Sequence, residues 1–179
     1  MIDHIEITIT YLEMGKAPSD RLAPAPPGTT PVLRPLLDPR VEDYRRLYNA
    51  VGEKWFWWER RVLPDAELER ILGEPGREVL VLEEGGEQAG FAELEHQEGG
   101  RALQVIYFGL VPAFIGRGLG GWFLSRVIDH AWSAAPRRVW LHTCTLDHPA
   151  ALSVYRKAGF VPFKTDTRSI PDPRLSGLF

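Results

Sequence analysis

The sequence predicts an α+β domain in which helices flank a central, mixed and mostly antiparallel sheet. Three strand-like runs follow one another, REVLVLEEG, QAGFAELEH and RALQVIYFGLV, and short turns containing Gly85-Gly86 and Gly99-Gly100 join them. Neighbouring strands joined by such short turns must be antiparallel. Helical and strand patterns then alternate towards the C-terminus, which adds parallel or long-range pairings to the same sheet.

The first third of the chain contains a strand, a connection and a second short strand. Residues 5–12, IEITITYL, alternate apolar and polar side chains with the period of a half-buried strand. The stretch from Pro18 to Pro31 contains several prolines, which have no amide N–H to donate, and it is typical of an extended connection. A short strand is expected at about 32–36. We therefore expect one domain over 1–179, with the strand and connection of about 1–31 as an embellishment.

Two helices are expected before the three-strand meander. Asp38 is a favoured N-cap and Pro39 suits a first helical position, so the first helix is predicted to begin there. The second is predicted at about 65–72, with Asp65 as its cap and Gly73 as its stop.

The C-terminal third continues with a helix, a strand, a helix and a strand. Leu119, Phe123, Val127 and Ala131 recur at spacing four and predict a helix after the glycine-rich stretch. The strand VWLHTCTL follows, then a helix over about 148–158 and a last strand that begins at Phe160.

Composition restricts the classes of function. The chain has 179 residues, 44% of them hydrophobic, and a net charge of −3, which argues against general nucleic-acid binding. Cys144 is the single cysteine, so an internal disulfide and a CxxC zinc site are excluded and no metal site is predicted. No apolar run approaches the ~20 residues of a membrane span. The first ten residues carry acids where a secretory signal carries positive charge, so a cytoplasmic location is expected.

The stretch FIGRGLGG at 114–121 matches two nucleotide-binding signatures. Gly116, Gly118 and Gly121 satisfy the G-x-G-x-x-G of dinucleotide-binding folds, and the shorter Gly116–Gly120 core equally suits a loop around the pyrophosphate of coenzyme A. The dinucleotide fold needs repeated βαβ units, and the upstream meander disfavours it. A P-loop is excluded because no Lys-Ser or Lys-Thr follows the glycines.

Two segments in this order, FGLVPAFIGRGLGGWFL and DHPAALSVYRKAGF, resemble the acetyl-CoA motif and the later tyrosine-containing motif of the GNAT acetyltransferase superfamily. With the meander and helices the resemblance covers about residues 32–163. It implies a GNAT-like fold, acetyl-CoA as cosubstrate, and acetyl transfer to the primary amine of a small-molecule or peptide acceptor. Ile115 stands where the family has Gln or Arg, and His148 where it has Asn.

The resemblance also implies a set of cofactor-binding residues. Backbone amides and the dipole of the following helix favour a pyrophosphate at the glycine loop, and Arg117 adds a charge-assisted contact. The amide of Leu110 or Val111 is the implied donor to the thioester carbonyl. The full set is Leu110, Val111, Ile115, Gly116, Arg117, Gly118, Leu119, Gly120, Gly121, His148, Ala151 and Tyr155.

Tyr155 occupies the general-acid position of the family, where it would protonate the departing thiolate. The alternative is a packed tyrosine whose hydroxyl is satisfied locally. The general base is less clear, because Gln104 stands where several members carry Glu, and a neutral amide cannot take a proton. Glu93 and Glu95, two apart on the preceding strand, are the expected substitutes, and solvent-facing carboxylates are the alternative. Tyr107 offers a third route by orienting a water.

The aromatic segment KWFWWERR at 54–61 is expected near the acceptor. By analogy with the family, Trp55, Trp57 and Trp58 wall an amine pocket together with Tyr107, where cation–π contact is available. Ordinary core packing is the alternative.

Four further hypotheses remain open from the sequence. His142 and Cys144 share a strand face and form a candidate nucleophilic pair, although strand geometry separates them by ~6–7 Å. Trp122, expected on the outer face of its helix, indicates a homodimer contact. The rival functions are a non-catalytic acyl-CoA-binding module and an NAD(P)-binding oxidoreductase.

Overall fold

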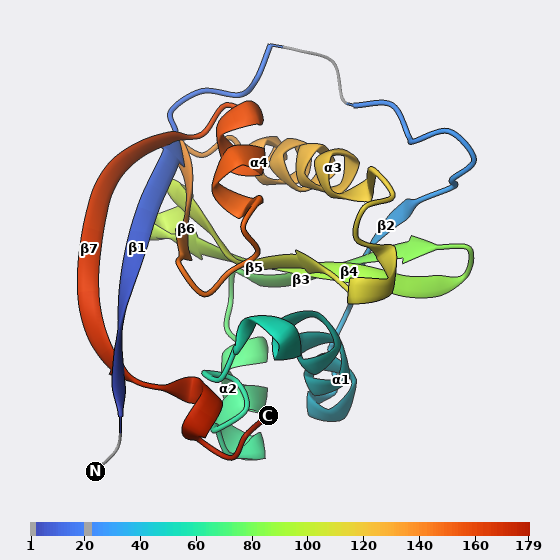
Figure 1. Ribbon diagram of the computed structural model, residues 1–179. Helices are drawn as coiled ribbons and strands as arrows, with labels where there is room; N and C mark the ends of the chain where they lie inside the picture. The colour runs from blue at the N-terminus through green and yellow to red at the C-terminus, as the bar shows by residue number, and fades with distance from the viewer. Residues whose placement is uncertain (1–2, 20–22) are drawn as a thin grey trace.

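The computed structural model describes residues 3–19 and 23–179, so that part of the proline-rich connection, 20–22, lies outside the described residues. Its seven strands form a single sheet in the order β2-β3-β4-β5-β6-β1-β7 (Figure 1). The strands are β1 (His4–Met14), β2 (Val32–Pro35), β3 (Arg77–Glu84), β4 (Glu87–Gln97), β5 (Ala102–Leu110), β6 (Arg138–Cys144) and β7 (Val161–Pro171). The helices are α1 (Val41–Gly52), α2 (Asp65–Leu72), α3 (Leu119–Ser133) and α4 (Ala151–Lys157).

The predicted fold class is confirmed. Every strand pairing described in the sheet is antiparallel except that of β5 with β6. A dinucleotide-binding fold requires a parallel sheet. The NAD(P)-binding alternative is therefore wrong for this architecture.

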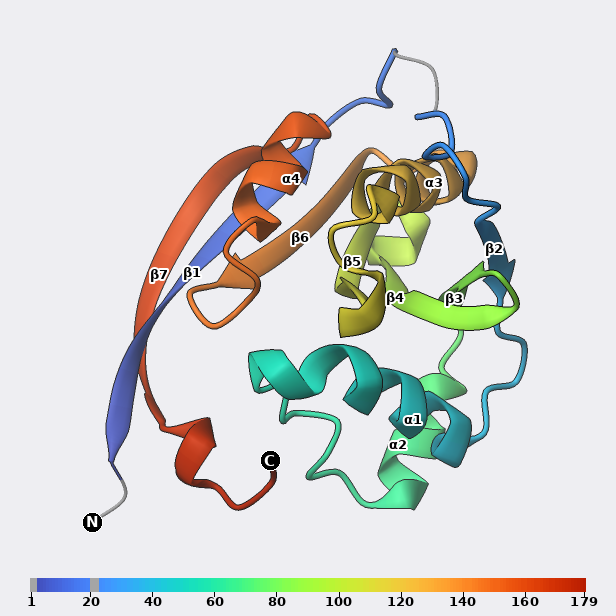
Figure 2. The same ribbon diagram turned by 45° about the vertical axis from the view of Figure 1, so that its right-hand side comes forward.

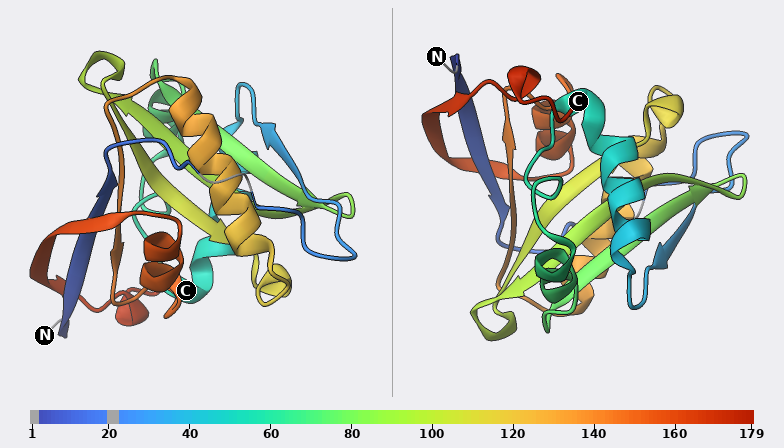
Figure 3. Two further views of the ribbon diagram at one scale, coloured as in Figure 1. Left: turned by 90° about the horizontal axis from the view of Figure 1, so that it is seen from above. Right: turned by 90° about the horizontal axis from the view of Figure 1, so that it is seen from below.

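The helices cover both faces of the sheet. Figures 1 and 2 show α3 and α4 on one side and α1 and α2 on the other, and the views from above and below in Figure 3 show α3 and α1 crossing opposite faces. One core lies under α3 and includes Phe123 and Val127, which are fully buried. The second lies under α1 and includes Tyr44 and Leu47. No described helix has the length and apolarity needed to cross a membrane.

The N-terminal strand is an integral part of the sheet. β1 pairs antiparallel with β6 on one side and with β7 on the other. The expectation that it embellishes the domain is thus wrong: removing it would separate β7 from the sheet. Alternation along residues 5–12 predicted the strand, but alternation carries no information on its partners.

Helix starts differ from those predicted. α1 begins at Val41 with Arg40 as its N-cap residue, and Asp38 has a left-handed φ of 46° and does not cap it. An N-cap residue has an extended backbone, which Arg40 adopts with φ −67° and ψ 143° and Asp38 does not. α2 begins at Asp65 itself, with Pro64 in the cap position, and α4 begins at Ala151 rather than near 148.

The sheet opens between β5 and β6. These strands pair in parallel only over 102–105 and 138–141, whereas β5 continues to Leu110 and β6 to Cys144 (Figure 2). A bulge between Glu93 and Leu94 lies opposite the point where pairing with β6 ends, and bulges bend and twist a strand. The second half of β5 therefore presents one backbone edge to an open space instead of a neighbouring strand.

Candidate active site

A cavity of about 540 Å³ occupies this opening and reaches both faces of the sheet. On the α3/α4 side it is lined by glycines of the 116–121 loop and by Tyr155. On the α1/α2 side it is lined by residues 55–59, which follow α1. The unpaired edge of β5 and the end of β6 form its middle section. Two groups bound on opposite faces can therefore meet inside one cavity.

The glycine loop is shaped to approach an anion closely. Gly116 and Gly118 have φ of 83° and 77°, a region that favours glycine, and Gly118 is the N-cap residue of α3. A Cβ atom at Gly116 or Gly121 would meet no other atom within 4 Å, so the space beside the backbone is open. The amides at the start of α3, a helix of 15 residues, direct partial positive charge towards this space. This donor set fits the pyrophosphate of coenzyme A.

The remaining loop residues contribute unequally. Gly120 and Ile115 line the cavity, and Leu119 is fully buried in the α3 core, so only its backbone is available. Arg117 is not among the described residues that line the cavity; its guanidinium lies 4.8 Å from the centre of the Phe114 ring. Its contact with a phosphate remains a prediction.

Backbone hydrogen bonds separate the two candidate oxyanion donors. The Val111 amide donates to the Ala89 carbonyl at 2.8 Å and is therefore occupied. Successive amides along a strand point to opposite edges, so that of Leu110 points towards the opening. Of the two predicted donors, Leu110 is the one that faces the cavity, and the assignment to Val111 is not supported.

Tyr155 lies on α4 and lines the cavity. Its ring packs against Phe108 and Phe160, at centroid distances of 6.1 and 6.3 Å, and only 7% of the residue is exposed. No described residue forms a hydrogen bond with its hydroxyl, so the locally satisfied alternative does not hold. Burial, with a smaller contribution from the charge of Asp147, raises the pKa of Tyr155 well above its ordinary value. The group is therefore protonated at neutral pH and able to donate.

His148 and Ala151 line the same end of the cavity. The His148 Nδ1 atom accepts a hydrogen bond from the Ala150 amide at 3.0 Å, and its ring meets the Trp55 ring edge-on at 4.9 Å. His148 therefore stabilises the turn that precedes α4 and contacts the acceptor-side aromatic segment.

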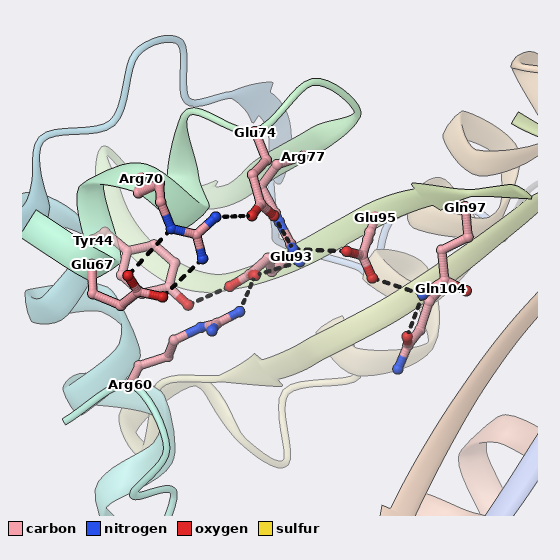
Figure 4. A network of polar contacts seen from close by, with 10 residues as sticks. All are labelled: Tyr44, Arg60, Glu67, Arg70, Glu74, Arg77, Glu93, Glu95, Gln97 and Gln104. Carbon is pink, nitrogen blue, oxygen red and sulfur yellow. Dashed lines mark hydrogen bonds and ion pairs between the residues drawn. The ribbon is translucent and has the colours of Figure 1, made fainter. Parts of the chain in front are cut away.

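Glu93 and Glu95 belong to a buried ionic network (Figure 4). Glu93 is fully buried; its carboxylate lies 2.6 Å from Arg60 and 3.1 Å from Arg77 and also accepts from the Tyr44 hydroxyl. Glu95 lies 2.9 Å from Arg77. Neither is among the described residues that line the cavity. Two arginines pair with Glu93 and leave it no access to an acceptor, and the solvent-facing alternative is equally wrong for it.

Gln104 is also buried and engaged. Its side-chain oxygen accepts a hydrogen bond from the Gln97 amide at 2.9 Å. Gln97 in turn accepts from the Trp140 indole at 3.1 Å. This chain of neutral groups contributes to packing at the closed end of the β5–β6 pairing.

The aromatic segment combines packing with cavity lining. Trp55, Trp57 and Trp58 all line the cavity, and Trp58 is 40% exposed. Trp57 also contacts the α1 core, with its ring 5.6 Å from Tyr48 and 5.1 Å from Tyr107. Burial raises the pKa of Tyr107, so it carries a neutral hydroxyl. Trp57 therefore both lines the cavity and packs in the core under α1, as the pocket interpretation and the core-packing interpretation respectively predicted.

Asp147 connects the two edges of the opening, a role that the sequence did not indicate. Its Oδ1 accepts from the Trp57 indole at 3.2 Å, and its Oδ2 accepts from the Thr143 hydroxyl at 2.7 Å and the Cys144 amide at 2.8 Å. The carboxylate thus holds the aromatic segment against the end of β6.

Glu59, which lines the cavity beside Trp58, is a second residue that the sequence interpretation overlooked. The Tyr48 hydroxyl lies 3.2 Å from its carboxylate. Its position directly after three tryptophans was the available signal.

His142 and Cys144 both line the cavity. Burial raises the pKa of the Cys144 thiol to about 11, so it is protonated at neutral pH and a poor nucleophile. Desolvation lowers the pKa of His142, against the opposing charges of Asp147 and Glu59. The predicted Cys–His nucleophile is therefore not supported.

Trp122 is buried, with 8% of it exposed, and the Arg126 guanidinium lies 5.1 Å from its ring. The sequence-based expectation of an exposed tryptophan for a dimer contact is wrong, since its ring packs in the α3 core.

Comparison with known proteins identifies the class to which this fold and cavity belong. The Acetyltransferase (GNAT) family profile matches residues 43–160, so the chain belongs to the GNAT family. Family members generally use acetyl-CoA as cosubstrate.

Individual relatives match at different levels. A mycothiol acetyltransferase of Thermobispora bispora is 39% identical over 91 residues, which are 51% of this chain and 27% of that protein. A putative GNAT acetyltransferase from Novosphingobium aromaticivorans has a TM-score of 0.60 at 17% identity, over 92% of this chain and 64% of that one. The chain thus spans less than two thirds of both relatives.

Another solved structure is similar in fold. An aminoglycoside acetyltransferase from an uncultured soil metagenomic sample, solved with sisomicin, has a TM-score of 0.58 at 14% identity, over 72% of this chain and 87% of that one. At this identity the similarity concerns the fold alone.

Proposed function

We propose that this chain transfers the acetyl group of acetyl-CoA directly to the primary amine of a small-molecule or peptide acceptor. One observation carries the proposal: a single cavity crosses the opening of the sheet and joins the glycine loop to the aromatic segment. A bound thioester supplies an activated acetyl group. Held from the α3 side, it lies within reach of an amine that enters from the α1 side.

Some residues of the cavity bind the cosubstrate, and others take part in catalysis. The amides of the 116–121 loop bind the pyrophosphate, and the Leu110 amide donates to the acetyl oxygen as negative charge develops on it. A preorganised donor of this kind contributes about 10²–10³ in rate. The bond from nitrogen to the acetyl carbon forms as the carbon–sulfur bond breaks. Tyr155 then gives its hydroxyl proton to the departing sulfur, because its raised pKa keeps the hydroxyl protonated beforehand. The nitrogen loses one proton to solvent as the amide forms, and solvent returns a proton to Tyr155.

Cosubstrate binding is tested by thermal melting. Acetyl-CoA at about 100 times its Kd adds about 2.7 kcal/mol, which raises the Tm of a domain of this size by roughly 5–11 °C. NADH in a parallel sample should leave the Tm unchanged. Absence of a shift with acetyl-CoA contradicts the proposal.

Catalysis is tested by substituting Tyr155 with Phe. Loss of a positioned general acid should lower kcat by about 10²–10⁴ while the acetyl-CoA melting shift persists. The matched control is Tyr11→Phe, whose hydroxyl accepts from Arg168 at 3.3 Å on the exposed strand pair. Equal kcat values for Tyr155→Phe and wild type would remove Tyr155 from the mechanism.

A further inference from the structure

The acceptor end of the cavity is mainly apolar. Its walls are the aromatic segment 55–58 on one side and Ile7, Ile9 and Ile170 of the β1–β7 pair on the other. Among the described residues that line the cavity, the acidic ones are Glu59 and Asp147, and none is a lysine or an arginine. An acceptor that fills this space is in contact mostly with carbon.

The two carboxylates differ in what they can still bind. Both oxygens of Asp147 already accept hydrogen bonds, from Trp57, Thr143 and the Cys144 amide. Glu59 accepts only from Tyr48 at 3.2 Å, and no described lysine or arginine pairs with it. An exposed carboxylate with unused acceptor sites next to aromatic rings is suited to an ammonium group. The acceptor end therefore offers one free negative charge.

His142 lines the same cavity, at the first β6 position beyond the pairing with β5. The groups that face it are the Tyr11 ring at 5.6 Å from β1, Glu59, Asp147 and, from β7, Arg168. Desolvation lowers its pKa, so the imidazole is neutral at pH 7. A neutral imidazole is able to receive a proton.

We propose that the acceptor is an amine with one positive charge on an apolar, aromatic-sized body, whose ammonium group is bound by Glu59 and whose proton passes to His142. The inference rests on the proposed acetyl transfer. An N–H bond of the ammonium breaks, its proton goes to the free ring nitrogen of His142, and the electron pair remains on nitrogen for attack on the acetyl carbon. Freeing an alkylamine at pH 7 costs about 3.4 pKa units, or roughly 4.6 kcal/mol, which makes a nearby base necessary.

Polycationic acceptors do not suit this cavity. Each additional ammonium group would lose its hydration against apolar walls without a carboxylate to pair with. The other acids of this face, Glu93 and Glu95, are already bound by Arg60 and Arg77. The charge arrangement therefore selects amines with a single charge over polyamines and aminoglycosides.

The first test compares three acceptors, 2-phenylethylamine, spermidine and kanamycin, by thiol release from acetyl-CoA. We expect kcat/KM for 2-phenylethylamine to be at least about tenfold above that of either polycation, since loss of one charged hydrogen-bond partner is worth a factor of this size. Preference for spermidine or kanamycin overturns this inference and leaves the proposed function intact. Failure of all amines, with acetyl-CoA still raising the Tm, overturns the proposed function itself.

The second test separates the two residues. Glu59→Gln should raise KM for 2-phenylethylamine about 10- to 100-fold with little change in kcat or Tm, because a charge-assisted hydrogen bond is lost. Glu87→Gln, at the exposed first residue of β4, is the matched control. His142→Asn should lower kcat by about 10²–10⁴ and abolish the fall in rate as pH drops through the lowered pKa of His142. An unchanged KM in Glu59→Gln, or an unchanged pH–rate profile in His142→Asn, contradicts the assignment of that residue.

Discussion

Replacing Glu93 with Gln tests whether this carboxylate is structural or catalytic. Glu93 is fully buried, and the side chains of Arg77 and Arg60 around it are 6% and 12% exposed. Arg77 keeps Glu74 and Glu95 at 3.0 and 2.9 Å, whereas Glu93 is the acidic partner that the structure gives to Arg60. The Nε atoms of both arginines have no hydrogen-bond partner in the described chain, so these cations depend strongly on Glu93. Glutamine keeps the shape and removes the charge.

The expected loss of stability is large. Removing one partner of a buried ion pair costs about 3–5 kcal/mol, because the remaining charge is left uncompensated. For a domain of this size each kcal/mol corresponds to roughly 2–4 °C in Tm, so Glu93→Gln should melt about 6–20 °C below wild type. The partly exposed Glu95 is the internal comparison, since Glu95→Gln should cost at most about 1 kcal/mol.

Thermal denaturation followed by circular dichroism measures the stability change, and the pH–rate profile of acetyl transfer measures catalysis. We expect Glu93→Gln to lower Tm while the apparent pKa values of the rate profile stay as in wild type. A variant that melts within about two degrees of wild type but loses the acidic limb of the profile would refute this reasoning. Glu93 would then be the general base that the sequence first suggested.

Two further substitutions test the packing that shapes the cavity. Gly109→Ala places a Cβ 2.5 Å from Val51 Cγ1, and overpacking of this kind should lower the free energy of unfolding, measured by urea denaturation, by about 1–3 kcal/mol. Gly15→Ala is the neutral control, because its Cβ would meet no atom within 4 Å. Equal urea midpoints for the two variants would contradict the predicted clash. Asp147→Asn keeps one acceptor oxygen, so it loses acceptance either from the Trp57 indole or from both Thr143 and the Cys144 amide, at about 1–3 kcal/mol for a donor left unpaired. It should also raise the acceptor KM more than the acetyl-CoA KM, measured by thiol release; an equal effect on both would show that Asp147 does not position the aromatic segment.

Local patterns predicted the elements of this fold well and their long-range pairing poorly. The turns at Gly85-Gly86 and Gly99-Gly100 determined the β3-β4-β5 meander, because short connections leave no other arrangement. β1 pairs with β6 and β7, two strands that lie more than a hundred residues from β1 along the chain; Ile9, for example, pairs with Cys144. Alternation fixes which side chains share a face but not which strand lies beside them.

The same limit explains the errors at the site. The spacing of Glu93 and Glu95 correctly placed both on one face, since both contact Arg77. What covers that face depends on α1, which supplies Tyr44, and on the loop that supplies Arg60. Because those contacts arise only in the folded chain, an apparent pair of catalytic acids became a buried ion network.

The two ends of the cavity depend on different features of the sequence. The cofactor end depends on backbone conformation: Gly116 and Gly118 adopt positive φ, and their requirement for glycine makes that end readable from sequence. The acceptor end is assembled from side chains of separate segments, Glu59 after α1, His142 on β6 and Ile170 on β7. No local motif joins these residues, and each can change without disturbing the pyrophosphate loop. For the acetyl transfer proposed above, acceptor specificity is therefore determined by the assembled wall and its charge and not by the glycine loop.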